Sequence, residues 1–266
     1  STFDITNIIV LKTIKMATPY IKNEIENGIA ILSFFHPEHN SLPSNLLSEL
    51  VDTINNLGNN DAVKVVILKS DGGTTFCAGA SFQELISIEN EATGKLFFSG
   101  FANVINAMRK CPKIIIGSIH GKAVGGGVGI AAATDYCLAT KYASVKLSEL
   151  TIGIGPFVVA PAIERKIGVS ALSQLTLDAN NFYSADWAHS KGLYNGVYQD
   201  NNELESAVNV MAQNLANYNP RALIELKKVL WKDTENWDEL LKVRAEISGK
   251  LVLSNFTKEA LKKFQK

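Results

Sequence analysis

The 266-residue sequence has no excess of charge of either sign. Lysine and arginine together number 26, aspartate and glutamate also number 26, and the isoelectric point is about 6.9. Nucleic acids and anionic membrane surfaces carry dense negative charge and attract proteins with a basic patch or stripe. We therefore expect neither a nucleic-acid nor a membrane partner for this chain.

Cysteine motifs and long apolar runs are also missing. The three cysteines, Cys77, Cys111 and Cys137, are far apart and form no Cys-x-x-Cys pair, which is typical of reduced thiols in a cytoplasmic protein. No apolar run approaches the roughly 20 residues of a membrane-spanning helix. The apolar run at 8–11 is too short for a secretory signal and has no small-residue cleavage site after it. We expect a cytoplasmic protein.

Several ligand-binding signatures are absent as well. Gly121-Lys122 is followed by Ala123 where a phosphate-binding P-loop has serine or threonine. The run at 125–130 lacks the third glycine of a dinucleotide fingerprint, and no G-x-S-x-G elbow occurs. The four histidines do not have the spacing of metal ligands. The sequence therefore predicts no metal site and no redox cofactor.

The hydrophobic pattern predicts an α/β core. Asn27-Gly28, a strong hairpin-turn signal, lies between alternating segments within 20–35. Runs rich in β-branched residues predict strands buried on both faces at 63–68 and 113–119. Apolar spacing predicts helices over 43–57, about 82–110, 128–133 and almost throughout from 168, with a glycine-rich loop at 71–80. Strands that alternate with helices imply βαβ-type units.

The change in pattern along the chain suggests three parts. These are an N-terminal extension (1–19), an α/β core (20–190) and a helical C-terminal region (191–266). Met16 is a candidate natural start, in which case the residues before it are an upstream extension.

Two loops of small residues are candidates for binding an anion. The segment 76–80 follows the strand predicted at 63–68, and Gly125-Gly126-Gly127 follows the strand predicted at 113–119. At such strand-to-helix junctions backbone N–H groups point outward unpaired, and no side chain blocks an approaching oxygen. Either loop alone is more often a tight turn. Together they predict a site for an oxygen that becomes negative during a reaction.

A carboxylate near these loops is a candidate acid or base. Glu149 lies in a partly apolar segment, and burial there would raise the pKa of its carboxyl group toward neutral pH, which suits general acid–base catalysis. The alternative is an ordinary surface or salt-bridged glutamate. Asp135 follows the helix predicted at 128–133, and we expect a structural hydrogen-bonding role for it.

Four segments together resemble the crotonase, or enoyl-CoA hydratase/isomerase, superfamily. They occur in the family's order and at its spacing, and the similarity covers roughly 20–266. The segments are Phe76-Cys77-Ala78-Gly79-Ala80-Ser81, the run HGKAVGGGVG at 120–129, Ala133-Thr134-Asp135 and Leu147-Ser148-Glu149-Leu150. The resemblance implies an α/β fold with a spiral β-β-α core and a helical C-terminal region that forms homotrimers or dimers of trimers.

The resemblance also implies roles in binding an acyl-CoA thioester. Coenzyme A would arrive as part of the substrate, and no other cofactor is implied. The backbone N–H groups of Ala80 and Gly126 would form an oxyanion hole for the thioester carbonyl, and Glu149 would be the catalytic acid or base. The other substrate-binding positions would be Ala78, Gly79, Gly125, Pro156 and Phe157. Separately, Lys262 lies with Lys258 and Lys263 in the last predicted helix and is a candidate contact for the CoA phosphates; the alternative is that these lysines form a solvated helix face.

The chain also departs from the family's most common pattern. Hydratases of the family use two glutamates twenty residues apart, and here the first position is Gly129 and the second is Glu149. Ser81 replaces the usual aspartate of the first loop. The sequence is similar to the bacterial methylglutaconyl-CoA hydratase branch of leucine degradation. We expect hydration of a 2-enoyl-CoA, with a Δ3,Δ2-enoyl-CoA isomerase and a non-catalytic acyl-CoA-binding homologue as alternatives.

Overall fold

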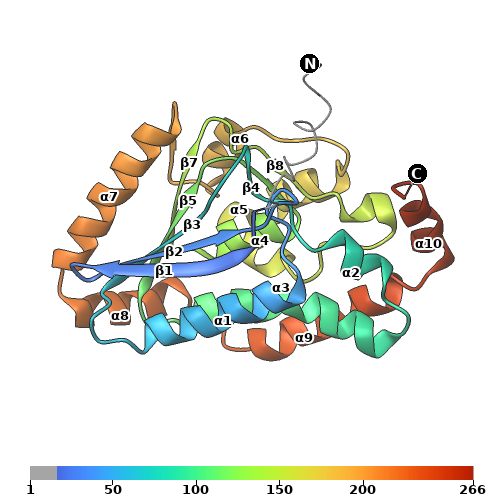
Figure 1. The fold of residues 1–266 in the computed structure, drawn as a ribbon, viewed down its shortest axis with the longest axis horizontal. Helices are drawn as coiled ribbons and strands as arrows, with labels where there is room; N and C mark the ends of the chain where they lie inside the picture. Colours follow the sequence, from blue (N-terminus) through green and yellow to red (C-terminus); the bar gives the residue numbers. More distant parts are fainter. Residues whose placement is uncertain (1–16, 266) are drawn as a thin grey trace, which may run out of the picture.

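The computed structural model describes residues 17–265, and a six-stranded sheet lies at its centre (Figure 1). Its strands, in spatial order, are β1 (Tyr20–Glu26), β2 (Ile29–Phe35), β3 (Val65–Ser70), β5 (Ile114–Ile119), β7 (Tyr136–Thr140) and β9 (Gly196–Tyr198). β1 is antiparallel to β2, and every other neighbouring pair is parallel. The predicted hairpin at 20–35 is confirmed, since Asn27 and Gly28 have φ of 52° and 80° and form a two-residue turn.

A second, smaller sheet is parallel and three-stranded. It consists of β4 (Thr75–Cys77), β6 (Lys122–Val124) and β8 (Val145–Lys146). The prediction of a loop throughout 71–80 is wrong at β4, because strands of two or three residues are too short to show alternation. Each short strand follows a strand of the main sheet along the chain, and a helix follows each short strand. This repeat is the spiral β-β-α core implied by the resemblance.

Helices make up most of the remaining described chain. They are α1 (Ser44–Gly58), α2 (Phe82–Ile86), α3 (Glu91–Lys110), α4 (Gly126–Ala133), the 3-10 helix η2 (Glu149–Ile152), α5 (Ala160–Leu177), α6 (Ala185–Lys191), α7 (Asn201–Asn217), α8 (Pro220–Leu230), α9 (Trp237–Leu251) and α10 (Asn255–Lys262). The helical stretch predicted over about 82–110 consists of two helices, α2 and α3, because Asn90 caps a new helix through a capping box with Thr93. The C-terminal helical stretch also begins earlier than predicted, at Ala160, and β9 interrupts it.

The main sheet is buried on both faces, as its β-branched strands predicted. Val66 and Leu68 of β3 belong to the larger core with α1, α3, α4 and α5, whereas Val65 and Ile67 pack against α7 on the other face. Figure 1 shows α7 and α4 on opposite sides of the strands. The sheet therefore supports two separate surfaces, one toward the larger core and one toward α7.

A buried ion pair joins the C-terminal helices to the core. Lys227 of α8 lies 3.0 Å from the Asp135 carboxylate, and their side chains are 4% and 2% exposed. Asp135 also accepts hydrogen bonds from the Ile115 N–H at 2.7 Å and the Trp231 indole N–H at 2.6 Å. The structural role expected for Asp135 is confirmed.

Breaking this pair should destabilise the protein strongly. Lys227→Met removes the cation and leaves the Asp135 carboxylate buried without its counter-charge, which typically costs about 3–5 kcal/mol. We expect urea denaturation to show a loss of this order in the free energy of unfolding. Lys228→Met is the matched control, because Lys228 pairs with Glu225 on the surface, where both side chains are more than 60% exposed. Equal losses for the two variants would contradict the role assigned to the buried pair.

The C-terminal helices pack closely on the α/β core. α9 crosses α3 where Gly94 faces Gly249, and a Cβ atom at Gly94 would lie only 2.7 Å from the Gly249 carbonyl oxygen. β9, which lies after residue 191, pairs with β7 in the main sheet. The division at 190 stays a prediction, and most of the predicted N-terminal extension, residues 1–16, lies outside the described residues. Between residues 17 and 265, no helix combines the length and apolar character needed to cross a membrane.

Candidate active site

Two strand-to-helix junctions meet at one place in the fold. The first follows β4 and contains Gly79 with φ of 90°, and the second follows β6 and contains Gly125 with φ of 55°. A Cβ atom at Gly79 would lie 3.1 Å from the Val124 carbonyl oxygen and 3.5 Å from the Gly126 nitrogen. Glycine at these positions therefore permits both the left-handed backbone and the close approach of the two loops.

The N–H groups of Ala80 and Gly126 are free at this junction. No backbone carbonyl of residues 17–265 accepts a hydrogen bond from either group. Gly126 is the first residue of α4, where N–H groups have no partner within the helix. Two such donors on one cavity wall can stabilise an oxygen that gains negative charge.

The two loops line a cavity of about 280 Å³. Eight predicted site residues contribute to its wall, namely Ala78, Gly79, Ala80, Gly125, Gly126, Glu149, Pro156 and Phe157. Most of the remaining wall is apolar and comes from α2, α3 and the segment 152–159. Besides Glu149, the polar side chains of the wall are Ser148 and Ser248. A small apolar cavity with one ionisable group suits a short acyl chain.

Lys262 is the predicted site residue that does not line this cavity. It lies in the last turn of α10, where its ammonium group pairs with Glu259 at 2.9 Å and its side chain is 67% exposed. Its role as a contact for CoA phosphates stays a prediction.

Glu149 supplies the carboxylate of the site. It begins η2, with two residues separating it from the end of β8, and its Oε2 atom is buried without a hydrogen-bond partner. A Cβ atom at Gly125 would lie 2.9 Å from Glu149 Oε1, so the carboxylate lies against the second glycine loop. Burial raises the pKa of Glu149 to about 7, and a hydrogen bond from its own backbone opposes this only in part. Such a carboxyl group can both accept and return a proton near neutral pH.

Comparison with known protein families agrees with this geometry. The sequence profile described as enoyl-CoA hydratase/isomerase matches residues 24–265. The chain belongs to the enoyl-CoA hydratase/isomerase family. It is an enzyme of the crotonase superfamily, and the expected fold class is confirmed.

Relatives of this enzyme include both hydratases and isomerases. A short-chain-enoyl-CoA hydratase of Clostridium acetobutylicum is 28% identical over 91% of this chain and 92% of its own length. A peroxisomal Δ(3,5)-Δ(2,4)-dienoyl-CoA isomerase of Arabidopsis thaliana is 27% identical, with 81% of each chain covered. The mitochondrial methylglutaconyl-CoA hydratase of Mus musculus is 30% identical over 69% of this chain and 59% of its own.

Solved structures of enoyl-CoA hydratases superpose on the fold of this enzyme. The enoyl-CoA hydratase of Bacillus halodurans superposes with a TM-score of 0.84 at 21% identity, covering 92% of this chain and 99% of that one. An enoyl-CoA hydratase of Mycobacterium avium gives a TM-score of 0.80 at 24% identity, with 92% and 95% covered.

At Gly129 the enzyme has no room for a second carboxylate. A Cβ atom there would lie 2.5 Å from Val159 Cγ1 and 3.5 Å from Ile105 Cδ1. Both apolar side chains are buried. The space beside Gly129 is therefore filled by Val159 and is not an open pocket for water.

The sequence patterns did not identify the aromatic wall of the enzyme's cavity. Phe97, Phe98 and Phe101 of α3 line it, and a Cβ atom at Gly126 would lie 2.3 Å from Phe101 Cε1. Their helical spacing marks them only as buried. Ser248 of α9, which is 1% exposed, also lines the cavity, and its position there depends on the close crossing of α3 and α9.

The buried carboxylate should make the stability of the enzyme depend on pH. The pKa of Glu149 is raised in the folded state from 4.5 to about 7, so the folded state binds more protons than the unfolded state between these values. Stability therefore falls as pH rises through this window and is constant above it. Glu149→Gln lacks this titration, and above about pH 7.5 its free energy of unfolding should exceed that of the wild type by on the order of 3 kcal/mol.

Urea denaturation of both proteins over this pH range tests the expected difference. Glu89→Gln is the control, because Glu89 is exposed and should leave the pH dependence unchanged. Parallel curves for wild type and Glu149→Gln would contradict a raised pKa at Glu149.

Proposed function

We propose that this enzyme hydrates a short 2-enoyl-CoA thioester with one catalytic carboxylate. The thioester oxygen accepts hydrogen bonds from the N–H groups of Ala80 and Gly126, which makes C3 of the substrate electrophilic. Glu149 takes a proton from water while the water oxygen attacks C3, and an enolate forms. The protonated Glu149 then returns the proton to C2, which yields the 3-hydroxyacyl-CoA and restores the carboxylate.

One observation carries this proposal. The Oε2 atom of Glu149 is buried without a partner beside the two free N–H groups, and the pKa of the group is about 7. The hydratase names of the relatives from Clostridium acetobutylicum and Mus musculus support hydration. The cavity of about 280 Å³ favours a short acyl chain, and we include the branched methylglutaconyl class among its substrates.

Isomerisation is the second candidate function. A Δ3,Δ2-enoyl-CoA isomerase needs one carboxylate to move a proton between the α and γ carbons, and it needs no water. The packing of Val159 beside Gly129 and the apolar wall around Phe157 favour this reaction. The isomerase from Arabidopsis thaliana among the relatives adds support.

Heavy-oxygen water distinguishes the two reactions. The enzyme would be incubated in H₂¹⁸O with crotonyl-CoA, 3-methylcrotonyl-CoA, 3-methylglutaconyl-CoA and a 3-enoyl-CoA, and the products analysed by mass spectrometry. Label at C3 of a 3-hydroxyacyl product supports hydration. Conversion of the 3-enoyl-CoA to its 2-enoyl isomer without label in any product would establish the isomerase instead.

We also propose that copies of this chain associate with one another through their C-terminal helices. Large apolar side chains on α8, α9 and α10 and just after α10 are 37% to 65% exposed, namely Val229, Val243, Ile247, Leu251, Phe256 and Phe264. Such a concentration of exposed apolar groups is typical of an association surface. We expect multi-angle light scattering to give the mass of a trimer or a hexamer. A monomer at micromolar concentration would contradict this expectation.

The role proposed for Lys262 is separate from the chemistry at Glu149. Lys262→Met should raise KM for acyl-CoA and leave kcat nearly unchanged, because a contact with CoA phosphates acts equally in the ground and transition states. Lys242→Met, an exposed change of the same kind on α9, is the control for the general loss of a surface charge. An unchanged KM for Lys262→Met would contradict the contact.

A further inference from the structure

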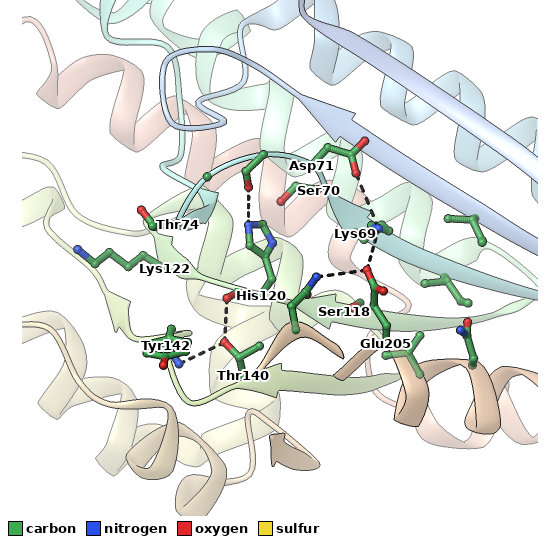
Figure 2. A pocket seen from close by; sticks show the side chains of 17 residues that line it. Lys69, Ser70, Asp71, Thr74, Ser118, His120, Lys122, Thr140, Tyr142 and Glu205 are labelled. Carbon is green, nitrogen blue, oxygen red and sulfur yellow. Dashed lines mark hydrogen bonds and ion pairs between the residues drawn. The ribbon is translucent and has the colours of Figure 1, made fainter. Parts of the chain in front are cut away.

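A second cavity, about 940 Å³ in volume, lies at the carboxyl ends of β3, β5 and β7 (Figure 2). It shares no lining residue with the cavity that contains Glu149. Ile31, Ile67 and Val208 form an apolar part of its lining, and most of its other lining residues are polar. In open parallel sheets the region beyond the carboxyl ends of the strands is a common place for ligands.

A buried hydroxyl group without a partner lies at this cavity. Ser70, the last residue of β3, lines the cavity and is 3% exposed, yet its Oγ atom has no hydrogen-bond partner. Within residues 17–265 only three buried side-chain polar atoms lack a partner, and another of them is Glu149 Oε2 at the first cavity. Because leaving a buried polar group unpaired is costly, Ser70 indicates a missing hydrogen-bonding group.

One end of the cavity is rich in hydrogen-bond donors. Figure 2 shows Lys122 and Thr74 together at this end, where the Lys122 side chain extends outward and its Nζ atom lies 5.4 Å from the centroid of the Phe182 ring. In the described chain no carboxylate pairs with Lys122, and no backbone carbonyl accepts from the N–H groups of Gly72, Gly73 or Thr74. His120 Nε2 lies 2.8 Å from the Gly72 carbonyl oxygen, so its ring anchors this loop. Because Lys122 is exposed, its ammonium group can turn toward a phosphate that accepts hydrogen bonds from these N–H groups.

The opposite end of the cavity has hydrogen-bond acceptors, and its charged side chains are already paired with one another within the protein. Asp71 accepts a hydrogen bond from Tyr20 at 2.6 Å and pairs with Lys22 at 3.3 Å, so its carboxylate is neutralised within the fold. The Lys69 ammonium group forms two loose ion pairs, at 3.8 Å each, with the carboxylates of Asp71 and Glu205. The Glu205 carboxylate is half exposed and can accept hydrogen bonds from hydroxyl groups of a ligand.

We propose that this cavity binds a phosphorylated pentose, free or as part of a nucleotide. The phosphate lies beside Lys122 and the loop 72–74, and the sugar hydroxyls bond to Ser70 and Glu205. Tyr142, which is 60% exposed and lines the cavity, provides a face on which a nucleobase can stack. The site is independent of the acyl-CoA chemistry proposed above, since no lining residue is common to both cavities.

Isothermal titration calorimetry of the full chain with ribose 5-phosphate, AMP and ribose tests the proposal. We expect saturable binding of one ribose 5-phosphate per chain at low salt, and at least about tenfold weaker binding of ribose, since a charge-assisted contact contributes more than 1.4 kcal/mol. Tighter binding of AMP would assign the natural ligand to the nucleotides, and equal or weaker binding would assign it to free sugar phosphates. Failure of both phosphorylated compounds to bind at millimolar concentration would overturn the proposal.

Two variants and a matched control locate the site. Lys122→Met should weaken ribose 5-phosphate at least about tenfold, whereas Lys141→Met should not, because Lys141 lies next to Tyr142 but does not line the cavity. Ser70→Ala should weaken binding without lowering the melting temperature of the free protein, since it removes an unpaired hydroxyl. Affinity should be unchanged in Lys262→Met, which alters the proposed contact for the CoA phosphates and lies outside this cavity. Loss of binding in Lys262→Met, or equal effects of the Lys122 and Lys141 variants, would place the phosphate elsewhere.

Discussion

Glu149→Gln is expected to lower kcat by about 10²–10⁴-fold with only a small change in KM. Glutamine keeps the size and most of the polarity of the side chain, but it cannot accept a proton. The loss therefore falls on the transition state. In the wild type, kcat/KM should rise with pH through about 7, where Glu149 becomes ionised, because the base acts in its ionised form. The variant should lose this rise.

Two measurements separate the chemical role of Glu149 from a structural one. Glu89→Gln, an exposed change of the same kind, should keep full activity. The Glu149→Gln protein should be folded and, above neutral pH, more stable than the wild type, so unfolding would not explain its inactivity. Activity within a few-fold of the wild type in Glu149→Gln would show that another group moves the proton.

Removal of the Ala80 N–H group should lower kcat by about 10²–10³-fold, the usual effect of losing one oxyanion donor. Incorporation of lactic acid in place of Ala80 replaces the amide by an ester and keeps the methyl side chain. The change deletes the donor without adding an atom to the cavity wall. The expected effect lies in kcat, because the hydrogen bond is stronger to the enolate than to the neutral thioester.

A side-chain substitution at Gly126 would not give an equally clear result. A Cβ atom there would lie 2.3 Å from Phe101, so activity and packing would change together. An ester at Ala143 is the control, because its N–H donates to the Thr140 carbonyl oxygen outside the cavity. We expect that ester to reduce stability and to leave kcat unchanged. Normal turnover by the Ala80 ester would remove Ala80 from the oxyanion hole.

The parts of the fold predicted from the sequence depend on strong local signals. Asn27-Gly28 specifies a hairpin because two successive residues tolerate positive φ. The run at 63–68 predicts β3, which the structure places at Val65–Ser70, because β-branched residues occupy both faces of the run. The small residues of both glycine loops and the apolar surroundings of Glu149 are equally local, and the structure brings all three together at one cavity.

The parts that were not predicted depend on contacts between distant segments. Val159 lies against Gly129, thirty residues away in the chain, and no periodicity reports that contact. The three short strands of the second sheet contain too few residues to show an alternating pattern. The second cavity joins Ser70, Lys122 and Glu205, which lie on three separate elements. In each case the information is in the tertiary packing of the whole chain.

One part of the first cavity's wall is made of main-chain atoms and another part of side chains. This difference determines which substitutions can change the acyl preference of the enzyme. The N–H groups proposed as the oxyanion hole belong to the main chain, whereas the wall proposed to contact the acyl chain consists of side chains on α3 and the segment 152–159. Substitutions at Phe97 or Val158 can therefore reshape the acyl site while the N–H groups of Ala80 and Gly126 keep their positions. Mutational libraries restricted to these side chains should yield changes in acyl preference with a high fraction of active clones. Libraries that include Gly79, Gly126 or Gly129 should yield mostly inactive protein.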